Sequence, residues 1–259
     1  MGIVVADLCK SMEKLAPLEY ALDWDNVGLQ IGSFTQNVST VLVTLTITED
    51  ILKKAVAEGV DLIISHHPLI FKPLRKIDIE LPLGKMLQTI IKNDMAIYVS
   101  HTNLDQAPFG LNHWLARELD LNDSKILIPH STPDVGLGRI GKIKPTSLKV
   151  LAQTLDKMWD TSVRVIGDVG QTVSTCAVVG GSGGDFISNA KIRGADVFIT
   201  GDLSYHDAID AAGLGLAVID AGHFATEKIM VSEVSKFLVE EFGHNINVLE
   251  ECGEDPFYL

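Results

Sequence analysis

Short apolar runs alternate along the chain with segments whose apolar residues recur at helical spacing. Strands are predicted for residues 38–47, 61–65 and 95–100, and helices for residues 48–59 and 83–94. Thr48 is a typical helix N-cap and Gly59 a typical C-terminal stop. Strands that alternate with helices are characteristic of α/β folds with largely parallel pairing.

A second strand–helix–strand unit repeats the first. Residues 173–200 align without a gap on residues 38–65, with nine identical pairs among 28. Any two units of this type share an apolar pattern, so it is the ungapped register and the repeated VST opening that favour an internal duplication. The segment between the copies mixes turn signals with a short helix, which indicates a boundary near residues 125 to 130. We expect one α/β domain of residues 1–127 plus about 220–259, and a second of residues 128–219.

The net charge and the cysteine content limit the possible partners and the cellular compartment. The net charge of −13 disfavours nucleic-acid partners, which need a basic face. No apolar run reaches the roughly 18 residues of a membrane span, and the N-terminus lacks a signal-peptide pattern. Three scattered cysteines (Cys9, Cys176 and Cys252) form no disulfide or zinc pattern, which indicates a reduced, cytoplasmic compartment.

Side chains suited to metal binding follow three apolar runs. The stretches SHHPLIF, VSHTNLD and DAGHFATE supply His66, His67, His101, Asp105, His223 and Glu227. Because His223 and Glu227 are four residues apart, a helix there would point both to one side. Sites in open α/β sheets gather at the carboxyl ends of strands, so we expect the three stretches to meet at one strand-end rim between the domains.

These residue types predict a metal centre. Mixed imidazole and carboxylate ligands suit Zn, Fe, Mn or Co, and the lack of cysteine among them argues against a closed structural zinc site. Five ligands (His66, His67, Asp105, His223 and Glu227) exceed what one open catalytic ion needs. A carboxylate can bridge two ions, so we expect two divalent ions per subunit and hydrolysis as the reaction class. Taken alone, Glu227 is better explained as a favourable charge at a helix N-terminus, and Asp105 could instead cap a turn or the helix after it.

Other polar residues have two readings each. His101 is the candidate catalytic residue, for orientation or proton transfer, or else a hydrogen-bonded histidine at a strand end. Asp202 and His206 would line the cavity, or else cap a helix and lie exposed. Asp25 and Asn26 would reach the same cavity, or else form the turn before Gly28.

Five ordered motifs make the chain resemble the Nif-three-like proteins, a family of dinuclear-metal proteins labelled GTP cyclohydrolase I type 2 homologues. They are WDNVGLQIG, SHHPLIF, VSHTNLD, TGDLSYHDAIDA and DAGHFATE, and the resemblance covers essentially the whole chain in its short form. It implies that His67 and Asp105 hold one ion, that His66 and His223 hold the other, and that Glu227 bridges them. It also implies two intertwined α/β domains and a homohexamer. The family often has aspartate where this chain has Thr46, so we expect no metal contact from Thr46.

The predicted function is a metal-dependent hydrolase of a nucleotide or related phosphorylated small molecule. In a GTP cyclohydrolase-like reaction water would attack the guanine ring, and in a phosphoesterase it would attack phosphorus. Two other classes remain open, namely a non-catalytic metal-binding ring scaffold or adaptor and a metal storage or delivery protein. Open coordination positions beside a nucleotide-sized pocket would favour the enzyme.

Overall fold

The structure, a computed structural model, describes residues 2–257, which form two compact α/β units. The first unit contains the described residues up to Leu104 and those from Met230 onward, and the second contains Asp105–Ile229. The first unit is therefore built from two separated segments of the chain. The longest described helix has 14 residues, and no helix of the described chain combines the length and apolar character needed to cross a membrane.

The unit boundaries differ from the sequence-based division at residue 127 and about residue 220. Helix α5 (Leu111–Glu118) and strand β5 (Asn122–Pro129) pack in the second unit, where β5 pairs antiparallel with β6 (Gly136–Ser147). Strand β10 (Ala217–Asp220) and helix α9 (His223–Glu227) belong to the same unit. These packing partners place residues 105–127 and 220–229 in the second unit.

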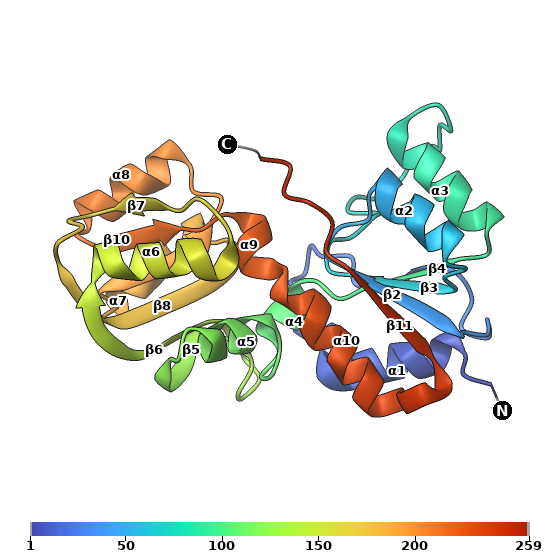
Figure 1. Cartoon of the computed structure of the whole chain (residues 1–259), viewed down its shortest axis with the longest axis horizontal. Coiled ribbons are helices and arrows are strands. Elements are labelled where there is room, and N and C mark those ends of the chain that lie inside the picture. Colours follow the sequence, from blue (N-terminus) through green and yellow to red (C-terminus); the bar gives the residue numbers. More distant parts are fainter. Residues whose placement is uncertain (1, 258–259) are drawn as a thin grey trace. The chain divides into compact units, whose positions relative to one another are not determined.

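A five-stranded sheet forms the centre of the first unit (Figure 1). Its order is β1-β4-β3-β2-β11, and all neighbours are parallel except β1 with β4. The elements of this unit are α1 (Val5–Leu15), η1 (Leu18–Tyr20), β1 (Gly28–Ile31), β2 (Thr40–Thr44), α2 (Glu49–Ala57), β3 (Leu62–Ser65), α3 (Pro82–Lys92), β4 (Ala96–Val99), α10 (Ile229–Phe242), η3 (Gly243–Asn245) and β11 (Asn247–Glu251). Helix α4 (Thr102–Gln106) lies where the chain passes into the second unit.

The core of the first unit explains its predicted elements. Strands β2, β3 and β4 are buried on both faces, as their continuous apolar runs require. Leu42, Ile63 and Ile97 pack with Ile51 of α2 and Ile90 of α3 on one face. Helices α1 and α10 cover the other face (Figure 1). The Thr48 hydroxyl accepts a hydrogen bond from the Ile51 N–H at 3.3 Å, which confirms the predicted N-cap.

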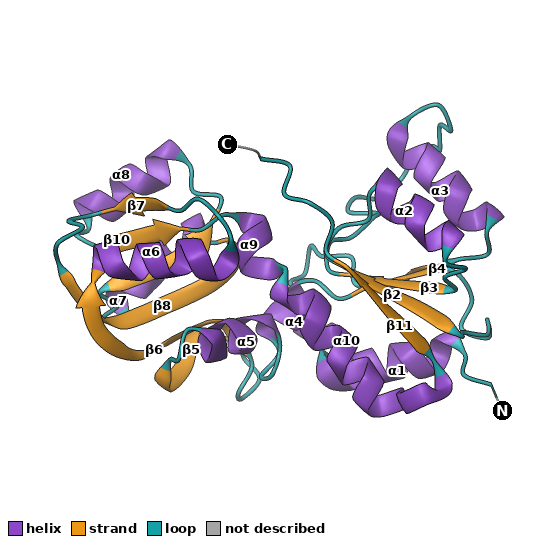
Figure 2. Ribbon diagram, in the orientation of Figure 1, coloured by secondary structure: helices purple, strands orange, loops and turns teal. Residues whose placement is uncertain are grey.

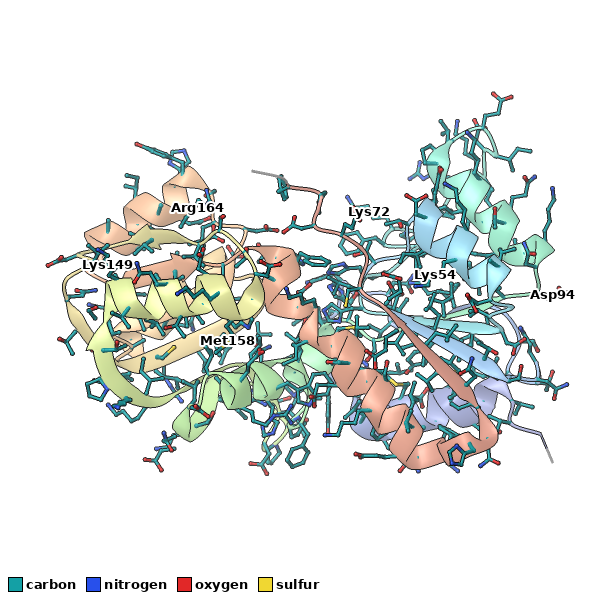
Figure 3. The ribbon with its side chains drawn as sticks, in the orientation of Figure 1. Lys54, Lys72, Asp94, Lys149, Met158 and Arg164 are labelled. Atoms are coloured by element: carbon teal, nitrogen blue, oxygen red, sulfur yellow. The ribbon has the colours of Figure 1, made fainter. Side chains whose placement is uncertain are left out.

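Strand β11 was not predicted from the sequence, because its pattern is polar and only half-buried. It pairs in parallel with β2 at the edge of the sheet. An ion pair between Lys54 of α2, labelled in Figure 3, and Glu251 joins the strand to the helix layer.

The second unit contains a six-stranded sheet in the order β5-β6-β8-β9-β10-β7. Figure 2 draws the strands in orange. Its other elements are α6 (Leu148–Trp159), β7 (Arg164–Ile166), β8 (Thr172–Ser182), η2 (Gly184–Phe186), α7 (Ile187–Ile192), β9 (Val197–Gly201) and α8 (Tyr205–Gly213). Strands β8, β9 and β10 are parallel, and β7 is an antiparallel edge strand beside β10. The order β8-β9-β10-β7 therefore repeats the order β2-β3-β4-β1 of the first unit.

The same set of three hydrogen bonds to an aspartate occurs in both copies and supports the duplication. The Asp61 carboxylate accepts hydrogen bonds from the Ser39 N–H and hydroxyl and from the Thr40 N–H, at 2.7–3.0 Å. The Asp196 carboxylate makes the same three contacts with Ser174 and Thr175, at 2.8–3.0 Å. In both copies an aspartate before one strand fixes the start of its parallel neighbour.

Candidate metal-binding site

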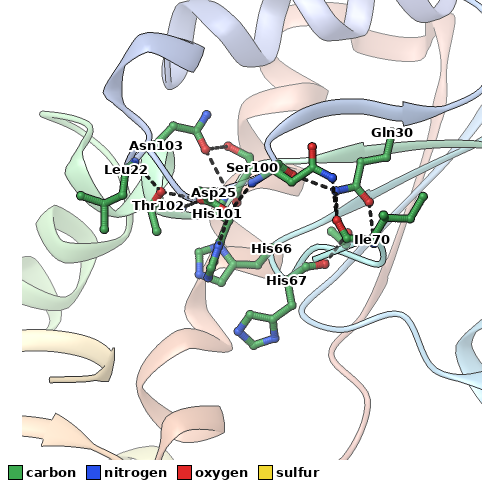
Figure 4. Close-up of polar contacts among 12 residues, drawn as sticks. Leu22, Asp25, Gln30, His66, His67, Ile70, Ser100, His101, Thr102 and Asn103 are labelled. Atoms are coloured by element: carbon green, nitrogen blue, oxygen red, sulfur yellow. Dashed lines mark hydrogen bonds and ion pairs between the residues drawn. The ribbon is translucent and has the colours of Figure 1, made fainter. Parts of the chain in front are cut away.

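Strand β3 ends immediately before two histidines that are held by backbone and side-chain contacts. The N–H groups of His66 and His67 continue the pairing with β2 by donating to the carbonyls of Thr44 and Leu45, at 3.2 and 2.9 Å. Nδ1 of the buried His66 donates to the Ser100 carbonyl at 2.8 Å (Figure 4). Nδ1 of His67 is hydrogen-bonded to the Thr46 hydroxyl at 2.6 Å. Both rings are thereby fixed through Nδ1, which makes Nε2 the candidate metal-binding nitrogen of each ring.

His101 follows strand β4 and is oriented by an aspartate from the WDNVG motif. Its Nδ1 lies 3.0 Å from Oδ1 of Asp25, while the other carboxylate oxygen accepts from the Thr102 N–H at 3.0 Å (Figure 4). Burial by itself raises the pKa of Asp25, but the hydrogen bonds from His101 and Thr102 outweigh burial and lower this pKa to about 2. Asp25 is therefore an ionised acceptor that fixes the ring of His101.

The three imidazoles form a triangle in the first unit. Their ring centroids are 5.1–5.7 Å apart, and their ligand nitrogens lie within 4.8 Å of one another. Three cationic imidazolium rings at this spacing would repel strongly, whereas neutral rings can share a cation. The arrangement of His66, His67 and His101 can thus hold a divalent ion.

A second imidazole–carboxylate group lies at strand ends in the second unit. His223 is the first residue of α9, and its Nε2 lies 2.8 Å from Oε2 of Glu227 one helical turn later. Its Nδ1 donates to the Asp202 carboxylate, which follows β9, at 2.7 Å. Burial by itself lowers the pKa of His223, but Glu227 and Asp202 outweigh burial and raise this pKa to about 9. This pocket favours a positive charge.

Glu227 is 3% exposed and lies against a glycine backbone. A Cβ at Gly181 would lie 2.2 Å from Oε1 of Glu227, and Gly181 has a positive φ of 66°. Only glycine combines this backbone conformation with this close approach. The glycine-rich stretch after Val178 is an irregular part of β8, with a register shift between Val178 and Ser182, that makes room for the carboxylate.

Asp220 holds the two loops that carry Asp202 and His223. Its buried carboxylate accepts hydrogen bonds from the N–H groups of Leu203 at 3.2 Å and Gly222 at 3.0 Å. It also forms an ion pair with Arg164 of the edge strand β7, labelled in Figure 3. These bonds tie both strand ends to one buried anion.

The remaining candidates occupy different surroundings. Asp105 lies in α4, 8% exposed, and its carbonyl accepts from the Asn112 side chain at 3.0 Å. Asn26 donates to the Ile70 carbonyl at 2.6 Å. His206 is exposed on α8 with its ring 5.6 Å from that of Tyr205, and it lies outside the described clusters that could hold an ion. The helix expected to follow His223 is interrupted at Lys228, between α9 and α10.

Sequence reasoning missed several residues that orient the candidate ligands, namely Thr46, Ser100, Gly181 and Asp220. Thr46 was expected only to avoid metal, and Ser100 acts through its carbonyl, which any residue could supply. The position of Gly181 in a glycine-rich run is a usable signal, but it cannot reveal Glu227 as the neighbour.

The fold and these clusters define a class, namely a two-unit α/β protein with histidine and carboxylate groups at the strand ends of each unit. The chain belongs to the Duf34/NIF3 (NGG1p interacting factor 3) family, whose sequence description matches residues 3–254. This confirms the family resemblance and the α/β fold expected from the sequence.

Relatives and solved structures match along nearly the full chain. Proteins named GTP cyclohydrolase 1 type 2 homolog from Streptococcus pneumoniae and Clostridium acetobutylicum are 35% and 36% identical, over 99% of this chain and of each relative. The crystal structure of a Bacillus cereus protein related to NIF3 superimposes with a TM-score of 0.94 at 28% identity, covering 99% of both chains.

Proposed function

We propose that this protein is a metal-dependent hydrolase that binds two divalent ions per subunit and acts on a nucleotide or a related phosphorylated small molecule. The ions would be held by His66, His67, Asp105, His223 and Glu227 and would be Zn, Fe, Mn or Co. The name of the relatives makes a guanine nucleotide the first substrate to test. The cytoplasmic location expected from the cysteines is part of the proposal.

The observation that carries the proposal is the common tautomer of the histidines. Nδ1 of His66 faces a carbonyl, and Nδ1 of His101 and of His223 each face a carboxylate. Such acceptors require a proton on Nδ1, so Nε2 is the candidate metal-binding nitrogen, and in His223 an ion would take the place of the proton that Nε2 shares with Glu227. Metal-binding histidines are typically held in this way.

The ions, Glu227 and His101 would have different roles in hydrolysis. Bound divalent ions would supply Lewis-acid activation of water and neutralise anionic oxygens. Glu227, buried and held beside Gly181, contributes the negative charge that offsets the ions. His101 is the candidate proton carrier, because the ionised Asp25 faces its Nδ1 at 3.0 Å and fixes the orientation of the ring.

The test reconstitutes the metal-free protein with each of the four metals and measures metal content and hydrolysis of GTP and of phosphoester substrates. Glu227→Gln keeps the shape but removes the charge, so at least one ion should be lost, with a loss of affinity at or above the ~10–100-fold typical of outer contacts. His101→Ala should lose activity; retention of both ions would support the proton-carrying role, and loss of an ion would make His101 a ligand instead. His244→Ala, an exposed histidine on η3, is the matched control.

Three outcomes separate the alternatives. Full metal binding and unchanged activity in Glu227→Gln would exclude the bridging role. Two tightly bound ions without activity on any substrate would favour the scaffold or adaptor. Readily exchanged ions without activity would favour storage or delivery.

A further inference from the structure

Two exposed aromatic rings lie beside the histidine triangle of the first unit. Trp24 is 56% exposed and Phe71 is 48% exposed, and their ring centroids are 5.6 Å apart at an interplanar angle of 57°. The Trp24 ring also meets the His101 ring edge-on, with centroids 6.0 Å apart. Trp24 and Phe71 thus form an open aromatic corner, in which the Trp24 ring adjoins the candidate catalytic residue His101.

Hydrogen bonds fix both of the loops that carry Trp24 and Phe71. Asp25, next to Trp24, is held by His101 and Thr102. The Gln30 side chain bonds both backbone groups of Ile70, next to Phe71, accepting at 2.9 Å and donating at 3.1 Å (Figure 4). The same Gln30 amide donates to the Asn26 carbonyl at 2.8 Å, and the Asn26 side chain donates to the Ile70 carbonyl. These hydrogen bonds therefore order the loops while leaving both rings exposed.

Large exposed aromatic rings on ordered loops are typical of ligand contacts. A planar heterocycle can stack on one ring and meet the edge of the other, because aromatic pairs favour both geometries. Stacking of this kind tolerates any base, since every base has a π-face. The corner adjoins His101, so a ring seated there would lie next to the histidine triangle.

We propose that Trp24 and Phe71 form the subsite that seats the purine ring of a nucleotide substrate beside His101. This inference rests on the proposed function for the role of the neighbouring histidines. It makes the base, and not only the phosphate, a recognised part of the substrate. The binding itself needs no metal, because the aromatic corner is assembled by hydrogen bonds within the chain.

The experiment uses metal-free full-length protein and tryptophan fluorescence. All three tryptophans are described, and Trp114 and Trp159 are only 5% and 2% exposed, so an added ligand reports mainly on Trp24. Guanosine 5′-monophosphate should quench the emission in a saturable manner, whereas ribose 5-phosphate, which lacks the ring, should not. Equal responses to the two probes, or no response to either, would overturn the proposal.

Variants test the second wall of the corner. Phe71→Leu should weaken guanosine 5′-monophosphate binding by about 5- to 150-fold, the range expected for loss of one stacking contact. Phe34→Leu is the control, because Phe34 is 56% exposed in the same unit and lies outside this pair. Equilibrium dialysis of Trp24→Leu should give a similar loss. Unchanged binding in Phe71→Leu would overturn the subsite. A change confined to the oligomeric mass would also overturn it and would assign the rings to a contact between copies.

The two proposals fail in different ways. Ring-dependent binding by a protein that takes up no metal would leave the subsite intact and remove the hydrolase function. Metal-dependent phosphoesterase activity without ring-dependent binding would remove the subsite and leave the hydrolase function.

Discussion

Each imidazole of the proposed centre is held through Nδ1 by a different kind of partner. The Ser100 carbonyl holds His66, Thr46 holds His67, and the carboxylates of Asp25 and Asp202 hold His101 and His223. The four rings are therefore aligned through the same nitrogen, by a carbonyl, a hydroxyl and two carboxylates.

Thr46 tests this alignment, since its only described contact with the site is with Nδ1 of His67. We predict that Thr46→Val, which keeps the shape and removes the hydroxyl, weakens metal binding by about 10–100-fold. Thr46→Ser should retain most of the affinity because it keeps the hydroxyl. Competition with a chromophoric chelator measures the affinity. Equal affinities for the valine variant and the parent protein would show that Thr46 does not position His67.

Gly181 provides a steric test of Glu227. We predict that Gly181→Ala displaces the carboxylate and lowers metal content, because the new Cβ would lie 2.2 Å from Oε1 of Glu227. The positive φ adds about 1–2 kcal/mol of strain. Gly194→Ala is the matched control, since Gly194 has a φ of 83° with no neighbouring atom within 4 Å. Elemental analysis and thermal unfolding should show a similar stability loss in both variants and a metal loss only in Gly181→Ala.

At the scale of secondary-structure elements, the sequence predicted what local patterns determine. The runs around β2, β3 and β4 are apolar enough to be recognised alone, and Thr48 and Gly59 mark the limits of α2. The polar edge strand β11 depends on a partner some 200 residues away, so no local pattern reveals it. Thr46 and Gly181 were missed for the same reason, because their roles arise from neighbours distant in sequence.

The duplicated aspartates make an element-scale prediction. We expect Asp61→Asn and Asp196→Asn each to destabilise the fold by about 1.5–3 kcal/mol, since each removes charge from an acceptor of three hydrogen bonds. Chemical denaturation at neutral pH measures the loss. A stability loss in only one of the two variants would show that the two aspartates no longer have the same role.

The acid dependence of the Asp196 contribution has a definite sign. Burial raises the pKa of Asp196, but hydrogen bonds from Ser174 and Thr175, aided by Lys142, outweigh burial and hold this pKa below the usual 3.8. A lowered pKa in the folded state means that the stabilisation is complete above pH 3.8 and is lost as the pH falls below it. The stability gap between the parent protein and Asp196→Asn should therefore narrow below that pH. A constant gap would contradict the ionised capping role.

At the scale of the whole molecule, the two units retain the same sheet order but have diverged at their strand ends. The strand that leads to His66 and His67 in the first unit corresponds to the one that leads to Gly201 and Asp202 in the second. Gly201 has no room for a side chain, because a Cβ there would lie 2.6 Å from the Gly222 backbone, and Asp202 orients His223. At this strand end one copy thus supplies two imidazoles, where the other supplies the carboxylate that orients His223.

The last prediction concerns assembly, for which we expect a closed homo-oligomer of six subunits. Ile192, Phe109 and Ile77 are among the large apolar side chains that are mostly exposed on the single chain, and contacts between copies would remove such surface from water. Light scattering should give a mass of about six times the 28.1 kDa of the chain. The melting temperature should rise with protein concentration if assembly stabilises the fold. Removal of metal should leave the mass unchanged, because apolar surfaces and not the ions would hold the subunits together. A monomer mass throughout the micromolar range would exclude the assembly and require another explanation for the exposed apolar side chains.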